Sequence, residues 1–280
     1  MKLKTNLLCL FVLAMGIIFS GCCKKVSGSR LNFLKIGAGC KIEWASNYDK
    51  DADKTDNCLC QFKGIYDSCS TVNPSTLNIP PVIQQTPVWC WLAVGEMVFK
   101  YYGLPTVNPA GNYQCGIMGV MGYVSGGACN TCNMSCENCI VPAGSSQMIS
   151  NMLKFYPQIT CKQLFNSNKT LNNTFIGSAL TTQELISELN NKRPVIAGIN
   201  PGATFIVPGS SQHVALITGY YYDANNKLVL RINDPYPYPI GSDPYLYFGG
   251  IKSGYLMYDI PYDLFYVNLN WNTSWYGMSW

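Results

Sequence analysis

Residues 90–102 read Cys-Trp-Leu-Ala-Val-Gly-Glu-Met-Val-Phe-Lys-Tyr-Tyr, and they are followed by Gly103 and Pro105. Apolar side chains recur in this stretch at the spacing of one helix face, at Val94, Met97, Val98 and Tyr101. A glycine followed by a proline is a common stop signal for a helix. The stretch therefore predicts a helix that begins at or just before Cys90.

Two further helices are predicted downstream of this stretch. Ser145 or Ser146 can cap a helix that runs to about Tyr156. Thr181 and Glu184 match a capping box, in which each side chain accepts a hydrogen bond from the other residue's backbone N–H. The buried face of that third helix is expected at Leu185, Ile186 and Leu189.

The pattern changes to strands after Lys192 and Arg193. Short runs rich in β-branched and aromatic residues, separated by turn-forming residues, are typical of strands. Such runs cover residues 194–199, 213–221, 227–232 and 254–260, with a turn at residues 223–226. Helices followed by a run of strands favour the α+β class with an antiparallel sheet.

The composition excludes several classes of protein. The chain has 280 residues, of which 48% are hydrophobic and 12% are charged, with a formal net charge of +4. Such a chain can bury a sizeable core and is not intrinsically disordered. No cluster of lysine and arginine covers one face, so nucleic acid is not expected as a partner. We expect a monomer without a cofactor.

The first residues have the pattern of an export signal. Lys2 and Lys4 precede an apolar stretch over residues 7–19, which is too short for a comfortable membrane span. The stretch ends in Phe19-Ser20-Gly21-Cys22, which resembles the lipobox of bacterial lipoproteins. The resemblance implies cleavage before Cys22 and lipidation of its thiol, whereas ordinary secretion with cleavage nearby is the alternative.

Export and lipidation predict the organisation and location of the chain. We expect a signal peptide over residues 1–21, a lipid-anchored tether with a small cysteine-rich region over residues 22–79, and one folded domain over residues 80–280. The protein would then lie in the bacterial cell envelope, held to a membrane by the lipid on Cys22 and facing the periplasm or the exterior. That compartment is oxidising.

The fourteen cysteines divide into groups. Cys9 leaves with the signal, Cys22 takes the lipid and Cys23 lies beside it. Two even-numbered groups suit disulfides, namely Cys40, Cys58, Cys60 and Cys69, and then Cys115, Cys129, Cys132, Cys136, Cys139 and Cys161. Residues 108–142 are a glycine- and cysteine-rich excursion. Its spacing from Cys129 to Cys139 is also zinc-like, but exported thiols usually oxidise, so no metal is expected.

Cys90 is left over as the odd cysteine, and an odd cysteine in an exported protein is either intermolecular or a reactive thiol. At a helix start the macrodipole and the unpaired amides favour a thiolate, which is a nucleophile for acyl transfer. His213 is the only histidine and hence the only imidazole base. Asn233 and Asp234 end the strand that follows, and one of them could orient His213.

The flanking residues at these positions resemble those of a known family. Gln84-Gln-Thr-Pro-Val-Trp-Cys90-Trp-Leu-Ala-Val-Gly-Glu-Met97 looks like the nucleophile region of papain-like cysteine peptidases. The bacterial subgroup related to bacteriocin-leader-processing peptidases and secreted effector proteases is the most similar. Lys192-Arg-Pro-Val195, His213-Val-Ala-Leu-Ile-Thr-Gly-Tyr220 and Asp234-Pro235 match its later segments in the expected order, so that the resemblance covers about residues 80–262.

The resemblance implies a papain-like fold, with the nucleophile helix packed on an antiparallel sheet, and it implies a role for each residue. Cys90 is the nucleophile, His213 the base and Asp234 the orienting residue, with Asn233 as a competitor for that place. Gln84 stabilises the oxyanion, and Gln85 is the alternative.

The implied function is that of an exported lipoprotein cysteine peptidase, which hydrolyses peptide bonds of a protein or peptide substrate through a thioester on Cys90. Two alternatives stay open. One is an acyl-transfer or deamidating enzyme with the same triad. The other is a surface-binding lipoprotein that keeps the fold without turnover.

Overall fold

The computed structural model describes residues 38–39, 48–51, 54–55, 75–124, 144–201, 211–239 and 241–280. All of them belong to the second of the two units into which the chain divides, residues 36–280. The predicted signal, Cys22 and the tract from Cys129 to Cys139 lie outside the described residues. Within the described stretches, no helix is both long and apolar enough to cross a membrane.

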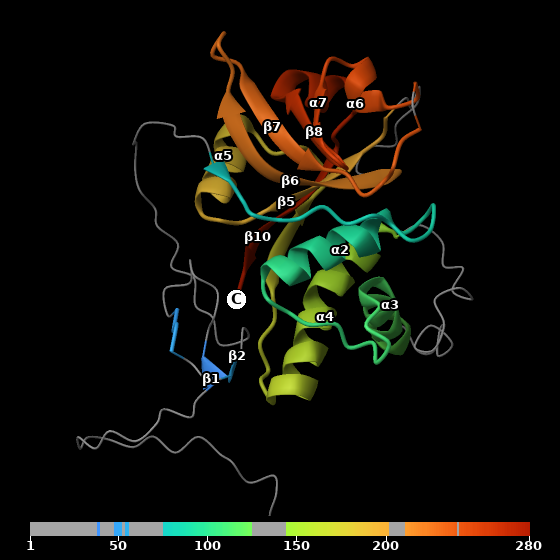
Figure 1. The fold of residues 1–280 in the computed structure, drawn as a ribbon, viewed down its shortest axis with the longest axis vertical. Coiled ribbons are helices and arrows are strands. Elements are labelled where there is room, and N and C mark those ends of the chain that lie inside the picture. Colours follow the sequence, from blue (N-terminus) through green and yellow to red (C-terminus); the bar gives the residue numbers. More distant parts are fainter. Residues whose placement is uncertain are drawn as a thin grey trace, which may run out of the picture. The chain divides into compact units, whose positions relative to one another are not determined.

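One antiparallel sheet contains most of the described strands (Figure 1). Its neighbouring strands follow the order β4, β10, β5, β6, β7, β9, β8, and β3 also pairs with β6. The strands are β3 Ser75–Thr76, β4 Asn172–Ile176, β5 Val195–Ile199, β6 His213–Tyr222, β7 Leu228–Asn233, β8 Ile251–Gly254, β9 Met257–Pro261 and β10 Thr273–Ser279. A separate parallel pair consists of β1 Ala38–Gly39 and β2 Lys54–Thr55.

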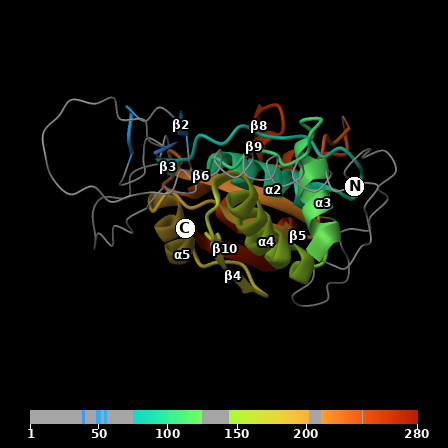
Figure 2. The same ribbon diagram turned by 90° about the horizontal axis from the view of Figure 1, so that it is seen from below.

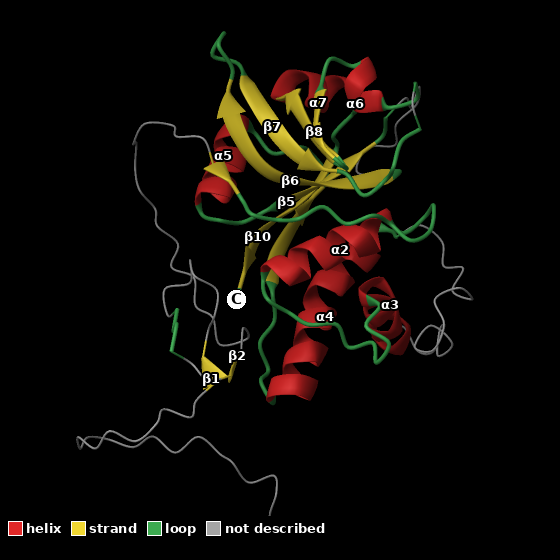
Figure 3. Cartoon of the chain, viewed as in Figure 1, coloured by secondary structure: helices red, strands yellow, loops and turns green. Residues whose placement is uncertain are grey.

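Six helices are found in the described residues, and with the sheet they confirm the predicted α+β class (Figure 3). They are α2 Cys90–Tyr101, α3 Tyr113–Val124, α4 Ser146–Phe165, α5 Thr182–Asn190, α6 Pro244–Tyr247 and α7 Tyr262–Asn268. Helices α2, α3 and α4 pack on one another, and α2 also contacts β6. Figure 2 shows α4 beside β4, which it contacts.

The predicted central strands and their turn are confirmed. Strands β5, β6 and β7 differ from the predicted ranges by no more than one residue at each end. In the turn between β6 and β7, the Asp223 carboxylate accepts the backbone N–H groups of Asn225 and Lys227 at 2.9 and 2.8 Å. This side-chain bonding is why an Asp-Ala-Asn-Asn run forms a turn.

The prediction of one strand over residues 254–260 is wrong. The chain reverses at Tyr255 and Leu256, so β8 and β9 form a hairpin. Leu256 adopts a φ of 59°, in the left-handed region that leucine rarely enters. A turn without glycine or asparagine at that position carries no sequence signal, so the sequence pattern predicts a continuous strand there.

The predicted end of the second helix near Tyr156 is also wrong, because α4 continues through Pro157 to Phe165. A proline removes one helical hydrogen bond and usually ends or kinks a helix. Here the neighbouring Tyr156 is fully buried, stacks on Phe99 with the ring centroids 4.6 Å apart, and donates its hydroxyl to the carbonyl of Pro105 at 2.9 Å. Such packing outweighs the local preference of the proline.

Helix α3 lies within residues 108–142, where no helix was predicted. Its residues are buried from Tyr113 to Gly122, so it shows no amphipathic period. At least one of its glycines permits close packing. A Cβ added at Gly116 would lie 2.8 Å from the hydroxyl oxygen of Thr106.

Residues 75–89, which we call the strap, connect the sheet to α2. The strap begins with β3, before the domain boundary predicted at residue 80, and the Leu77 N–H donates to the Thr218 carbonyl at 2.7 Å. Gly219 is required beneath it, because a Cβ there would lie 2.6 Å from the Ser75 carbonyl oxygen. The strap therefore passes close over β6 before it reaches α2.

Candidate active site

Cys90 is the first residue of α2 and is buried, with 6% of its surface exposed. It is the free cysteine among those described, since Cys115 and Cys161 are each disulfide-bonded. Trp89, the residue before the helix, makes no side-chain capping bond. The first amides of α2 are therefore not occupied by a capping side chain, and the helix start favours an anion.

His213 is the first residue of β6, which β5 and β7 hold on either side. Its imidazole is largely buried and hydrogen-bonds to both Cys90 and Asp234. Burial lowers the pKa of His213, but the charge and hydrogen bond of Asp234, together with the Cys90 contact, act in the opposite direction. The net result raises the pKa of His213 from 6.5 to about 10.

Asp234 follows the last residue of β7 and is fully buried. Its Oδ1 lies 2.7 Å from the Nε2 of His213 and also accepts the Tyr236 N–H at 2.8 Å. Its Oδ2 accepts the hydroxyl of Tyr245 at 2.8 Å and that of Tyr238 at 3.4 Å. Both oxygens of this buried carboxylate are thus hydrogen-bonded, as a buried charge requires.

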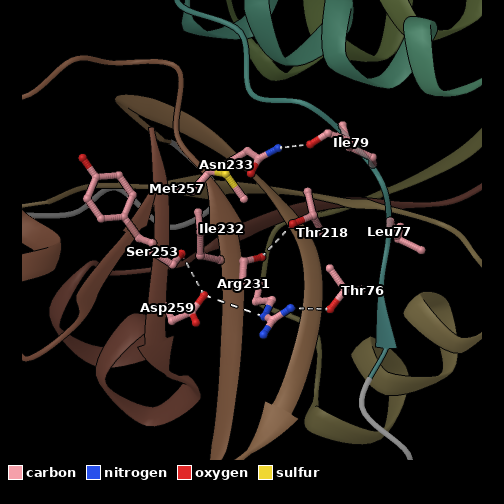
Figure 4. Close-up of a pocket in the computed structure, with 11 residues that line it drawn as sticks. Thr76, Leu77, Ile79, Thr218, Arg231, Ile232, Asn233, Ser253, Met257 and Asp259 are labelled. Carbon is pink, nitrogen blue, oxygen red and sulfur yellow. Dashed lines mark hydrogen bonds and ion pairs between the residues drawn. The ribbon is translucent and has the colours of Figure 1, made fainter. Parts of the chain in front are cut away.

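Asn233 points to a different part of the molecule. Its Nδ2 donates to the carbonyl of Ile79 in the strap at 2.7 Å, which Figure 4 shows. It lines a cavity of about 240 Å³ between the strap and strands β6, β7 and β9. Successive residues at the end of a strand face opposite sides. Asp234 therefore contacts the imidazole, whereas Asn233 hydrogen-bonds to the strap.

Gln84 and Gln85 occupy different surroundings. Gln84 is buried, its backbone N–H donates to the Pro235 carbonyl at 3.0 Å, and its Nε2 donates to the Thr86 carbonyl at 2.7 Å. Gln85 is exposed, and its Oε1 accepts from Asn112 at 3.0 Å. Gln84 is therefore held next to the backbone that carries Asp234, whereas the side chain of Gln85 is engaged with the loop before α3.

Three tyrosines complete the surroundings of His213 and Asp234, and no specific role was predicted for them. The rings of Tyr236 and Tyr238 both meet the His213 ring edge-on, with the centroids 6.3 Å apart. Burial, together with the charge of Asp234, raises the pKa of Tyr245 well above its ordinary value, so its hydroxyl stays a donor. The available signal was the alternation of tyrosine and proline over residues 235–239.

The structure brings Cys90, His213 and Asp234 into one hydrogen-bonded set. Asp234 occupies Nε2 of the ring, which leaves Nδ1 for the Cys90 thiol. The raised pKa of His213 favours the protonated imidazole beside Cys90. In such a pair, a thiolate can attack a carbonyl carbon, and the imidazolium can give its proton to the leaving group.

The structure gives little information on the other predicted sites. Cys22 and the zinc-like tract are not among the described residues. In the part of the chain that is described, no group of three or more His, Cys, Asp or Glu side chains is placed to hold a metal ion.

The residues of the candidate site lie within a range that matches a known protein family. A family model, described as the Peptidase_C39 like family, matches residues 76–246, which is more than half of the chain. The matched range includes the strap from Thr76 onward, Cys90, His213 and Asp234. No curated protein matches the chain.

Proposed function

The chain belongs to the Peptidase_C39 like family, and from this membership we propose a cysteine peptidase that uses Cys90 as nucleophile and His213 as base. The family indicates cysteine-peptidase activity and a protein or peptide substrate. The observation that carries the assignment of residues is the contact of one imidazole with both Cys90 and the buried Asp234.

In the proposed acylation step, the Cys90 thiolate attacks the carbonyl carbon of the scissile peptide bond. The developing oxyanion is stabilised by the Cys90 backbone N–H and by Gln84. Protonated His213 gives its proton to the leaving amine as the C–N bond breaks, and a thioester on Cys90 is formed.

In the deacylation step, neutral His213 removes a proton from water, and the resulting hydroxide attacks the thioester. The new acid leaves, and the thiolate and imidazolium are restored. Asp234 holds the ring through Nε2 and stabilises its charge in both steps. Each turnover therefore consumes one water and needs no cofactor.

The assignment is tested with a peptide epoxide that alkylates a nucleophilic thiol. We expect a single adduct, on Cys90, which mass mapping of the labelled peptides would locate. Cys90→Ala is the control and should give no adduct. Labelling of another cysteine alone, or Cys90 recovered in a disulfide, would refute the mechanism.

The same triad could transfer the acyl group to an amine or deamidate glutamine. Product analysis with and without an added primary amine separates these reactions from hydrolysis. A domain that only binds its partner would show neither product, although the contacts of Cys90, His213 and Asp234 would have no purpose in such a protein.

We also propose that the peptidase has a papain-like fold and is exported and anchored through lipid on Cys22 in the bacterial cell envelope, with residues 22–79 as its tether. The support is the basic start, the apolar stretch and the small residues before Cys22. Cys22→Ser should release soluble protein or leave uncleaved precursor, as seen by membrane fractionation. Wild-type protein that is soluble and carries no lipid would contradict the anchor.

A further inference from the structure

Gln114 is a fully buried amide near the start of α3, with 1% of its surface exposed, and the mechanism above does not use it. Its Nε2 donates to the carbonyl of Ile83 at 2.9 Å, and its Oε1 accepts the backbone N–H of Gln85 at 3.1 Å. The Gln114 side chain therefore hydrogen-bonds to the backbone of the strap on both sides of Gln84.

The Gln114 amide also binds a residue of the nucleophile helix α2. Its Nε2 also donates to Oε2 of Glu96 at 3.1 Å, and Glu96 is a buried residue of α2. The other oxygen of Glu96 pairs with Lys100 at 2.5 Å. Both donors and the acceptor of the Gln114 amide are thus in use.

These contacts form a bridge from α2 through Glu96 and Gln114 to the strap. Cys90 is at the start of α2, and Gln84 is the strap residue between the two backbone groups that Gln114 binds. The distance between the nucleophile and the oxyanion donor therefore depends on a side chain from a third element, α3.

We propose that Gln114 is a positioning residue, which sets Gln84 at the place where the oxyanion develops. This inference rests on the proposed function, because it needs an oxyanion at Cys90. It assigns no contact between Gln114 and the substrate: the effect passes through the backbone of the strap. Preorganised donors lose most of their effect when they move from the position of the developing charge.

The test compares two reactions of Cys90. Hydrolysis of p-nitrophenyl acetate forms an oxyanion, whereas alkylation by iodoacetamide needs only the thiolate. Gln114→Met removes the hydrogen bonds at similar volume, and it is measured alone and together with Gln84→Ala. Asn108→Ala is the matched control, since Asn108 is also buried and caps the neighbouring loop by accepting the Ala110 N–H at 2.8 Å.

We expect Gln114→Met to lower kcat for the ester by about tenfold, which is less than the loss expected when an oxyanion donor is removed outright. The KM for the ester and the rate of alkylation should change little. In the Gln84→Ala background it should lower kcat no further, because the residue through which it acts is already gone. Asn108→Ala should leave kcat unchanged. Equal effects of Gln114→Met with and without Gln84 would overturn the proposal.

A second pair of variants keeps the test decisive if Gln114→Met does not fold. Glu96→Gln and Glu96→Met both lose the charge that pairs with Lys100, but only glutamine retains an oxygen that can accept from Gln114. Glu96→Gln should keep kcat and Glu96→Met should lower it. Equal kcat values would contradict the bridge. Wild-type protein without ester turnover and without labelling at Cys90 would instead refute the proposed function, and the role of Gln114 with it.

Discussion

The two sides of the candidate site are built differently. On the base side, the Asp234 carboxylate accepts hydrogen bonds on both oxygens, from His213 and the Tyr236 N–H on one and from Tyr245 on the other. On the side of the proposed oxyanion, Gln84 donates one N–H to Thr86 within its own loop, and its buried Oε1 has no hydrogen-bond partner among the described residues.

This difference shows that the two sides of the candidate site are held in place by different parts of the fold. His213 and Asp234 come from paired strands, so the sheet itself places them together. Gln84 comes from an irregular segment whose place depends on contacts with other elements. An amide nitrogen has two N–H groups, and in the proposed mechanism the one not bound to Thr86 would donate to the oxyanion.

The largest loss of activity is expected from substitution of Cys90 or His213. Cys90→Ala and His213→Ala should each lower kcat/KM by at least about a thousandfold, because a triad acts as a unit. Hydrolysis of a peptide substrate is measured, and circular dichroism shows that the variants fold. Full activity of His213→Ala would mean that another group is the base.

The next effect isolates the oxyanion side. Gln84→Ala should lower kcat by about a hundredfold, the usual cost of one lost oxyanion donor, while Gln85→Ala should have little effect. Steady-state kinetics of the two variants decide between the neighbours. A larger loss for Gln85→Ala would move the oxyanion role to that residue.

A smaller effect isolates the base side. Asp234→Ala should lower kcat/KM by more than tenfold, about 1.4 kcal/mol, because the imidazolium loses its carboxylate. Asn233→Ala should affect mainly the free energy of unfolding, since Asn233 bonds to the strap at Ile79. Kinetics and urea melts of both variants test this separation, and a reversed order of activities would exclude the carboxylate as the orienting group.

A further effect concerns stability rather than activity, as a dependence of the free energy of unfolding on pH. Folding raises the pKa of His213 from 6.5 to about 10, so protonation of the ring stabilises the folded state. This contribution is complete below pH 6.5 and is lost as the pH rises through 10. Thermal melts should show the Tm advantage of wild type over His213→Gln narrowing across that window; a constant difference would contradict the raised pKa.

The sequence predicted the strands of the site and the start of α2 at Cys90, but it did not predict α3. Strands with alternating or continuous apolar runs are visible in one dimension, and antiparallel neighbours place His213 and the end of β7 together. The resemblance favoured Asp234 over Asn233, and the contact of Asp234 with His213 agrees with that choice, since the two side chains take opposite faces at the end of the strand.

The contribution of α3 was not predictable in the same way. A helix buried on all sides has no hydrophobic period, and the spaced glycines within it resemble loop residues. Gln114 therefore lies in a segment, residues 108–142, for which the sequence predicts no helix. Its three hydrogen bonds join residues distant in sequence, and no local pattern reports such contacts.

The solitary imidazole also gives the protein a built-in reporter. The chain has one histidine, and its two ring nitrogens meet Asp234 and Cys90. In a sample with ¹⁵N-labelled histidine, an NMR spectrum of the ring would contain one spin system without overlap. The two nitrogen shifts would follow the proton on each side separately, so that thiol alkylation and changes of pH could be read without assigning any other resonance.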